Sequence, residues 1–551
     1  MLRSIFWKTM REHRWALLIW SVLVMLILIS VYASLSQIDV SQLGSLTQNR
    51  AYVFLNDPVA TDTASGYVTF KYGFSFSLML SIFAMLIGSR LIRGEEARGS
   101  LDLLLATPHS RQDLLREKVL ATALSMVVLG LAFGVGALLG EASQHDPASV
   151  GGALLAGFDL SLLLFFYAML ALFISQYTRT AGAAAGATGA LYALFFVLDG
   201  TGRAYPNLAW VQRLSPNYYY GLSKPLIPSY GTNFGAMALL LALGLLLLIG
   251  SMVIFLRRDM GAVATLLFRR ILRNGTARTV SPDAQIECAA RDPWLRSVLA
   301  RALRAGGPGL GWWMLGVFLY AAYGAGIVKS SEQQLRDAIE GSPAFAQLFG
   351  ANLLATDYGF VSLAVFLIIS IAAMLYALIR ANDWPANQDN GRLDIVLSTP
   401  QPRWQVALQW YGTALVGFIL LALANALGIM VGAAATGLTL DAGRVFAASL
   451  ALVPPMALIA GAVYALGARL RSAVDLEIVG GYLAIAFFMD LLRSALKLPG
   501  WTQRLSIFTA YGTPITDGVN WTSVGVMLLL AALFTGIGVS LFQTGDIRQG
   551  G

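Results

Sequence analysis

The chain has 551 residues, of which 57% are hydrophobic and only 12% are charged. Soluble globular proteins carry about 25% charged residues and disordered chains carry few large apolar ones, so the composition excludes both classes and favours a polytopic membrane protein. The net charge is +8, but the basic residues stand in short groups between apolar runs. Membrane topology explains that pattern better than nucleic-acid binding, so we expect no nucleic-acid partner.

The first predicted element covers residues 3–14, where apolar and basic side chains alternate at helical spacing. Such a stretch predicts an elbow helix that lies on the inner membrane surface, with its apolar side in the lipid and its basic side toward the headgroups. The same pattern returns at residues 296–304, at a shift of 293 positions. We therefore expect two elbow helices, one ahead of each half of the chain.

Apolar runs, each near the length that a membrane-spanning helix requires, predict twelve transmembrane helices. The runs lie at about 15–32, 74–91, 119–139, 154–177, 181–198, 234–256, 312–328, 360–379, 406–435, 445–468, 473–489 and 524–541. Between the fifth and sixth runs, residues 201–228 are rich in proline and aromatic residues, which predicts an external or re-entrant segment. The predicted fold is an all-α membrane protein.

A charged stretch between the second and third runs, residues 93–118, recurs once as residues 387–404. At a shift of 292 positions, seven residues are identical: Gly99, Leu101, Asp102, Leu105, Thr107, Pro108 and Arg111 pair with Gly391, Leu393, Asp394, Leu397, Thr399, Pro400 and Arg403. Each copy predicts a short amphipathic helix with an aspartate in its first turn, ended by the Thr-Pro pair because proline disfavours helix in the residue before it.

A third correspondence joins Arg179 to Arg471, ahead of the fifth and eleventh runs, again at a shift of 292 positions. Three markers in one register predict an internal duplication, with repeats at 1–262 and 291–551 and a cytoplasmic linker at 263–290. Because each repeat contains an even number of spans, the two repeats are parallel. With both charged stretches and both termini inside, 27 of the 38 lysines and arginines lie on the cytoplasmic side, as positive-inside topology requires.

The chain shows no energy source or catalytic centre of its own. No Gly-Lys dipeptide occurs, so a Walker A loop is absent and the chain cannot hydrolyse ATP by that route. Ionisable residues inside the predicted spans are few; Asp159 lies early in the fourth, and Asp490 with Arg493 near the outer end of the eleventh. No nucleophile, base and orienting group stand together, and no metal-ligand spacing occurs, so we expect no enzyme activity and no bound metal.

A transporter without an energy source must obtain it through a cytoplasmic contact, and the two charged stretches are the candidates. Glu95, Glu96 and Arg98 could form ion pairs with a soluble partner, while Arg111 and Arg403 could either pair with that partner or bind anionic lipid. The cysteine count adds nothing here, since Cys288 stands alone.

The stretch from Glu95 to Arg111, EEARGSLDLLLATPHSR, resembles the cytoplasmic signature of type-2 ATP-binding-cassette exporter permeases, and the duplicated six-span unit resembles their fused, drug-exporting and polyketide-antibiotic-exporting form. The resemblance implies two copies of a separate nucleotide-binding ATPase, with ATP and Mg bound there and no cofactor on this chain. It implies coupling helices at Leu101–Thr107 and Leu393–Thr399, and a substrate path lined by the first, second and fifth spans of each half. It also implies export of hydrophobic or amphipathic compounds across the bacterial cytoplasmic membrane.

The residues expected at the ATPase contacts are Glu95, Glu96, Arg98, Gly99, Leu101, Asp102, Leu105, Thr107, Pro108 and Arg111, with Gly391, Leu393, Asp394, Leu397, Thr399, Pro400 and Arg403 in the second copy. The second copy departs from the pattern because Asn387 and Gln388 replace the two glutamates, so we expect an asymmetric or weaker second contact. Two other hypotheses remain open from the residues alone: an ion-coupled twelve-span carrier, and a polytopic membrane enzyme.

Overall fold

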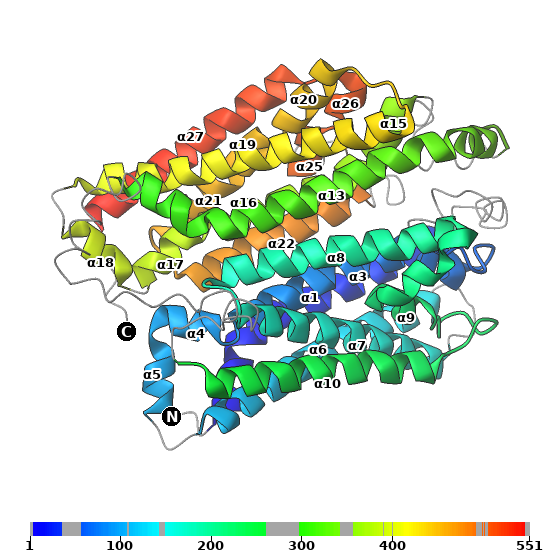
Figure 1. Cartoon of the computed structure of the whole chain (residues 1–551), viewed down its shortest axis with the longest axis horizontal. Helices are drawn as coiled ribbons and strands as arrows, with labels where there is room; N and C mark the ends of the chain where they lie inside the picture. Colours follow the sequence, from blue (N-terminus) through cyan, green and yellow to red (C-terminus); the bar gives the residue numbers. More distant parts are fainter. Residues whose placement is uncertain are drawn as a thin grey trace, which may run out of the picture.

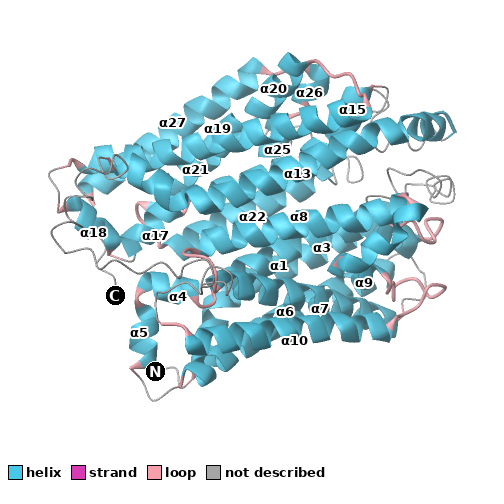
Figure 2. Cartoon of the chain, in the orientation of Figure 1, coloured by secondary structure: helices cyan, strands magenta, loops and turns pink. Residues whose placement is uncertain are grey.

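A computed structural model of the chain describes residues 4–35, 57–106, 110–142, 149–259, 297–341, 356–389, 391–398, 401–491, 499, 501 and 505–545. Within these ranges the regular structure is helical, apart from one isolated bridge between Lys224 and Gly231. The long helices lie side by side along one direction, with the N-terminal half below and the C-terminal half above in the view of Figure 1. Figure 2 shows the same bundle with its short connecting loops.

The elements of the first half begin and end as follows: α1 (Ile5–Leu35), α3 (Ala64–Arg90), α4 (Arg93–Arg98), α5 (Ser100–Leu105), α6 (Arg111–Ala142), α7 (Val150–Ser175), α8 (Ala181–Ala204), the 3-10 helix η2 (Pro206–Leu214), α9 (Pro216–Gly221) and α10 (Phe234–Arg257). The elements of the second half are α13 (Val298–Gly341), α15 (Asp357–Val361), the π-helix η4 (Ser362–Phe366), α16 (Leu367–Ala381), α17 (Asp383–Asp389), α18 (Arg392–Leu397), α19 (Arg403–Thr436), α20 (Ala442–Leu450), α21 (Val453–Gly467), α22 (Ser472–Leu491), α25 (Ile507–Tyr511), α26 (Pro514–Asp517) and α27 (Trp521–Thr544).

The described residues contain nine helical segments that are long and apolar enough to cross a membrane, or ten if the bent pair Ala64–Phe70 and Ser75–Arg90 forms one span. The expected runs at 312–328 and 473–489 fall in α13 and α22, which are not among these segments. The chain is thus an all-α, multi-pass membrane protein, and the part that the structure describes contains nine or ten clear spans against the twelve predicted.

The predicted elbow helices are not separate elements. Residues 5–14 form the first turns of α1, which runs without interruption from Ile5 to Leu35, and the second copy opens the 44-residue helix α13. The first stretch has no proline or glycine to turn the chain, so the amphipathic turns continue directly into the apolar ones. In α13 a proline, Pro308, lies inside the helix and does not end it.

Corresponding helices make corresponding contacts in the two halves. Helix α1 packs on α6 as α13 packs on α19, α7 packs on α10 as α21 packs on α27, and α3 packs on α7 as α16 packs on α21. The backbone N–H of Phe6 donates to Glu117 over 2.8 Å, and that of Leu299 donates to Gln409 over 3.2 Å, at the same register. Three helix N-caps also recur on corresponding helices: Thr63 and Thr356, Ser149 and Asp441, and, at a shift of 287 positions, Asn233 and Asn520.

The two halves meet along α8 and α13, and α1 of the first half contacts α22 of the second. The proline-rich segment after α8, for which we expected an external or re-entrant path, turns back as η2 along α8 and continues into α9. Prolines stand at the first turns of both η2 and α9, where a missing N–H costs no helical hydrogen bond. The junction between the two halves is therefore formed by α8 and α1 on one side and by α13 and α22 on the other.

Candidate functional site

The two duplicated segments form two short helical corners, α4–α5 and α17–α18, at the same end of the bundle, on the left in Figure 1. Helix α1 begins and α27 ends at this end too. At each corner a glycine takes the left-handed conformation, with φ of +69° at Gly99 and +65° at Gly391. Residues with a Cβ atom are sterically strained at such φ values. A glycine at this position therefore ends the first short helix of each corner and redirects the chain into the second.

The short amphipathic helices predicted from the duplication are confirmed as α5 and α18. Their first leucines, Leu101 and Leu393, are 2% and 1% exposed and pack into the core of the protein, whereas Asp102 is exposed. Leu105 and Leu397 are half-buried. Arg98 ends α4 and Asp394 lies in α18. Four of the expected site residues lie outside the described residues: Thr107, Pro108, Thr399 and Pro400.

Glu95 occupies the centre of a buried ion cluster. Its Oε1 atom lies 2.7 Å from Nζ of Lys118 on α6 and 3.1 Å from Nζ of Lys8 on α1, and the Ser100 hydroxyl donates to its other oxygen. The side chains of Glu95 and Lys118 are 1% and 3% exposed. Charge-assisted bonds in such a dry setting are strong only when every partner is present, so α4, α6 and α1 are fixed together by this carboxylate.

Glu96 joins the same corner to two further helices. Its carboxylate lies 2.7 Å from Arg93 and 2.5 Å from Arg258, the residue after α10. Arg93 also donates from Nε to the Ser175 carbonyl at the end of α7, over 2.9 Å. Burial, together with the nearby charge of Arg258, lowers the pKa of Arg93, and Glu96 opposes that shift.

These contacts change the role expected for the two glutamates. We expected Glu95 and Glu96 to face a soluble partner, but both side chains are buried and form their ion pairs within the chain. Sequence reasoning missed their partners Lys8, Lys118 and Arg258. The only signal for Lys118 was its place at the end of the charged stretch 93–118, next to an apolar run.

The second corner is held by other chemistry. The Trp384 ring is fully buried and stacks on Tyr464 of α21 with centroids 4.6 Å apart, and it meets Phe542 of α27 edge-on at 5.2 Å. The Asn387 amide donates to the Asp383 carbonyl over 2.6 Å, and the Ser472 backbone N–H donates to Asp389 over 2.7 Å. Aromatic packing, hydrogen bonds and the partly exposed Arg380–Asp383 ion pair here take the place of the buried ion cluster.

Arg111 and Arg403 make the same contact in both halves. The Arg111 guanidinium donates over 3.0 Å to the carbonyl of Arg258, the residue that caps the end of α10. The Arg403 guanidinium donates over 2.9 Å to the carbonyl of Gly545, the cap of α27. A cation at a helix C-terminus satisfies carbonyls that lack helical partners and interacts favourably with the helix dipole. Each arginine thus ties the third long helix of its half to the last one.

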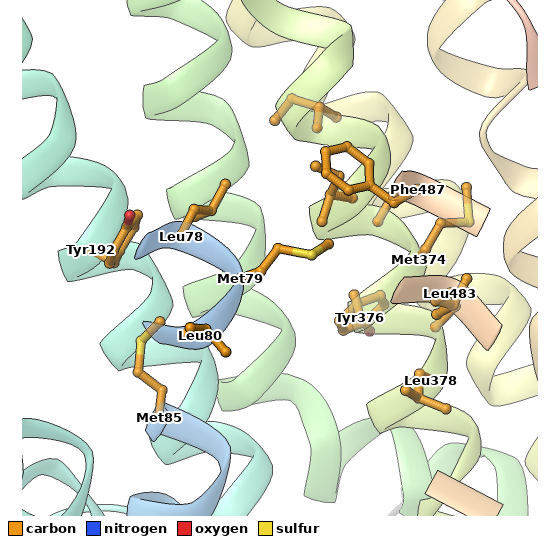
Figure 3. Packing of buried hydrophobic residues seen from close by; sticks show 14 of the residues in the cluster. Leu78, Met79, Leu80, Met85, Tyr192, Met374, Tyr376, Leu378, Leu483 and Phe487 are labelled. Carbon is orange, nitrogen blue, oxygen red and sulfur yellow. The ribbon is translucent and has the colours of Figure 1, made fainter. Parts of the chain in front are cut away.

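A cavity of about 1060 Å³ lies between the two halves, next to both corners. It is lined by α1, α3 and the start of α8 from the first half, and by α13, α16 and α22 from the second. Figure 3 shows part of its apolar wall, where Met79 of α3 points toward Met374 of α16, with Tyr376, Leu378 and Leu483 nearby. Large apolar pockets with a few polar groups are the usual form of small-molecule sites.

Away from the corners, the two halves close on each other. The Thr201 hydroxyl of α8 donates to the Tyr323 hydroxyl of α13 over 2.7 Å, and the rings of Phe196 and Tyr320 lie 6.0 Å apart. By contrast, the cavity residues nearest the corners include exposed arginines. The cavity is therefore open toward the corner end and closed by α8 and α13 at the other.

The ionisable residues that we noted within the predicted spans lie apart from this cavity. Asp159 is 1% exposed on α7, and its carboxylate has no hydrogen-bond partner among the described residues. Asp490 accepts a hydrogen bond from the Thr509 hydroxyl over 2.7 Å, and Arg493 lies outside the described residues.

Comparison with known families gives two matches that together span most of the chain. Residues 3–260 match the family described as ABC-2 family transporter protein. Residues 295–543 match the family described as the C-terminal domain of the multidrug efflux system permease Rv1217c. A comparison with curated proteins gave no match.

Proposed function

Because the chain belongs to the ABC-2 family of transporter permeases, with a multidrug efflux permease domain as its second half, we propose that it is the membrane subunit of an ATP-driven exporter. ATP hydrolysis then takes place on a separate subunit, which binds ATP and Mg. The observation that carries the proposal is the placement of two short helical corners at one end of the bundle, beside a cavity between the halves.

The exposed side of each corner is the proposed contact with one ATPase copy, so two copies bind one chain. On the first corner the contact comprises Asp102 and the exposed side of α5, and on the second it comprises α18 with Asp394. Glu95 and Glu96 act behind that surface: they pass a displacement of α4–α5 to α1, α6 and α10 through buried ion pairs. Such buried, fully paired charges hold the corner rigidly to these helices, whereas exposed ion pairs are weakened by water.

We further propose that the chain folds as two parallel six-span repeats, at 1–262 and 291–551, joined by a cytoplasmic linker at 263–290. The shared helix contacts, the paired N-caps and the matching Arg111 and Arg403 bonds support this arrangement. In it α13 and α22 are also spans, and the corners, the linker and both termini lie on the cytoplasmic side of a bacterial inner membrane. The substrate path is the cavity, lined by the first, second and fifth spans of each half.

The proposal predicts a directed, ATP-dependent efflux of hydrophobic or amphipathic compounds. The test uses the chain purified together with a Walker-A protein encoded beside it and reconstituted in vesicles. We expect vanadate-sensitive ATP hydrolysis and ATP-dependent uptake of an amphipathic dye into inside-out vesicles. Dye uptake driven by an ion gradient without the ATPase would contradict the proposal and would restore the ion-coupled carrier.

A further inference from the structure

The mouth of the central cavity is strongly basic. Nine basic and four acidic side chains line the cavity, and they gather at the end near the corners. Three of the four carboxylates, together with Glu95 just behind the lining, are already paired with lysines or arginines of the same chain. The remaining carboxylate, Glu477, forms no ion pair with the arginines of the cavity among the residues that the structure describes.

Two of those arginines are Arg179 and Arg471, the pair that the sequence duplication singled out. Each stands just ahead of the fifth long helix of its half, so they face the cavity from α8 on one side and from α22 on the other. Both are exposed, and neither forms an ion pair with another residue that the structure describes. Arg11 and Arg14 of α1 are exposed at the same mouth.

Beyond this basic mouth the wall becomes apolar. Trp20 and Phe83 pack together with ring centroids 5.7 Å apart, and Trp313 lies 5.6 Å from Tyr376 on the opposite side. All four residues line the cavity. A ligand that satisfies both parts must carry a negative head and an apolar body, because an unpaired cation gains most from an anionic partner and the aromatic wall gains from excluding water.

We propose that the cavity binds amphipathic anions, with the anionic head between Arg179 and Arg471 and the apolar body against the aromatic wall. This inference rests on the proposed function, since it names the substrate class of the same cavity. The head is a carboxylate, sulfonate or phosphate, and its source is either a free amphiphile or an anionic phospholipid of the inner leaflet. Arginine suits all of these heads because its planar fork binds two oxygens at once.

The test measures binding to the purified full chain in phosphatidylcholine nanodiscs. The probes are 11-bromoundecane-1-sulfonate and 11-bromoundecan-1-ol, which share a chain and differ in charge; bromine quenches tryptophan fluorescence on contact, and Trp20, Trp313 and Trp410 line the cavity. We expect saturable quenching, with the sulfonate bound at least about tenfold more tightly than the alcohol. The double variant R179Q/R471Q should lose that preference, while the matched control R213Q, an exposed arginine outside the cavity, should keep it.

A repeat in nanodiscs doped with phosphatidylglycerol separates the two sources of the head. Weaker sulfonate binding there identifies the phospholipid as a competing occupant, and unchanged binding identifies the free amphiphile; both support the proposal. Equal binding of the two probes, or a preference that survives in R179Q/R471Q, would overturn it. No ATPase is present in this measurement, so its failure is distinguishable from failure of the export proposal.

Discussion

In the first half, α4–α5 is fixed by six charged side chains, whereas in the second half α17–α18 is fixed by a stacked tryptophan, hydrogen bonds and one partly exposed ion pair, Arg380–Asp383. At a shift of 292 positions, four of the charged residues are replaced by uncharged ones: Arg93, Glu95, Glu96 and Lys118 correspond to Pro385, Asn387, Gln388 and Trp410. The backbone corner, with its left-handed glycine, is the same in both. One corner geometry can therefore be maintained by two kinds of buried interaction, which respond differently to mutation.

The largest expected effect comes from truncating the two glutamates. In E95A/E96A, Lys118 and Arg258 become buried cations without their carboxylates, and breaking a buried pair in this way costs about 3–5 kcal/mol of unfolding free energy. We expect most of the ATPase to be lost from a pull-down, together with a lower melting temperature of the chain. N387A/Q388A is the matched control, because it removes the hydrogen bond from the Asn387 amide to the Asp383 carbonyl and strands no charge. Equal losses in the two double variants would remove the asymmetry between the corners.

The second expected effect concerns the aromatic support of the other corner. W384A removes a fully buried ring that contacts Tyr464 and Phe542, so it should cost about 3–5 kcal/mol of unfolding free energy. The corresponding residue, Ile92, is equally buried but is aliphatic. I92A should cost less, since it forfeits no ring–ring contact. Denaturant unfolding of both variants measures the difference, and a larger loss in I92A would contradict the assignment of aromatic packing to the second corner.

The third effect distinguishes two corresponding close helix contacts, one in each half. A Cβ atom added at Gly432 would lie 1.9 Å from the Ala322 carbonyl oxygen of α13, whereas one added at Gly140 would lie 2.5 Å from the Tyr32 ring of α1. A side chain can move aside more easily than a backbone carbonyl. We therefore expect G432A to cost about 1–3 kcal/mol and G140A to cost less. G536A, where the added atom meets nothing within 4 Å, is the control in thermal unfolding, and a similar loss there would contradict the packing argument.

Much of this comparison could be predicted from the sequence, and the reasons for success are local. The glycine, the first-turn aspartate and the Thr-Pro ending all act within a few residues, so the duplication predicted α5 and α18 correctly. The shift of 292 positions likewise singled out Arg179 and Arg471, which the structure places at one cavity. Local patterns of this kind can be interpreted from the sequence without knowledge of the tertiary structure.

The failures depend on long-range contacts. Lys8 and Arg258 are separated from the glutamates that they pair with by 87 and 162 positions, so their pairing appears only after the helices pack. For the same reason, the sequence predicted that Glu95 and Glu96 contact a soluble partner, whereas the structure shows that they form ion pairs within the chain. The elbow helices failed for a different reason: an amphipathic pattern predicts which face meets lipid headgroups but not whether the helix continues into the next apolar turn.

The smallest effect tests the feature that the two halves share. R111Q and R403Q each remove a guanidinium from carbonyls at the end of the last helix of their half, over matching distances of 3.0 and 2.9 Å. Both arginines are half-buried, so each substitution should cost about 1 kcal/mol, because a shorter amide replaces a charge-assisted bond. Melting temperatures of the two single variants should fall equally. Arg111 donates to the carbonyl of Arg258, whose side chain belongs to the ion cluster. If only R111Q lowers the melting temperature, Arg111 stabilises the protein through that cluster, and the contact with the helix end does not stabilise both halves in the same way.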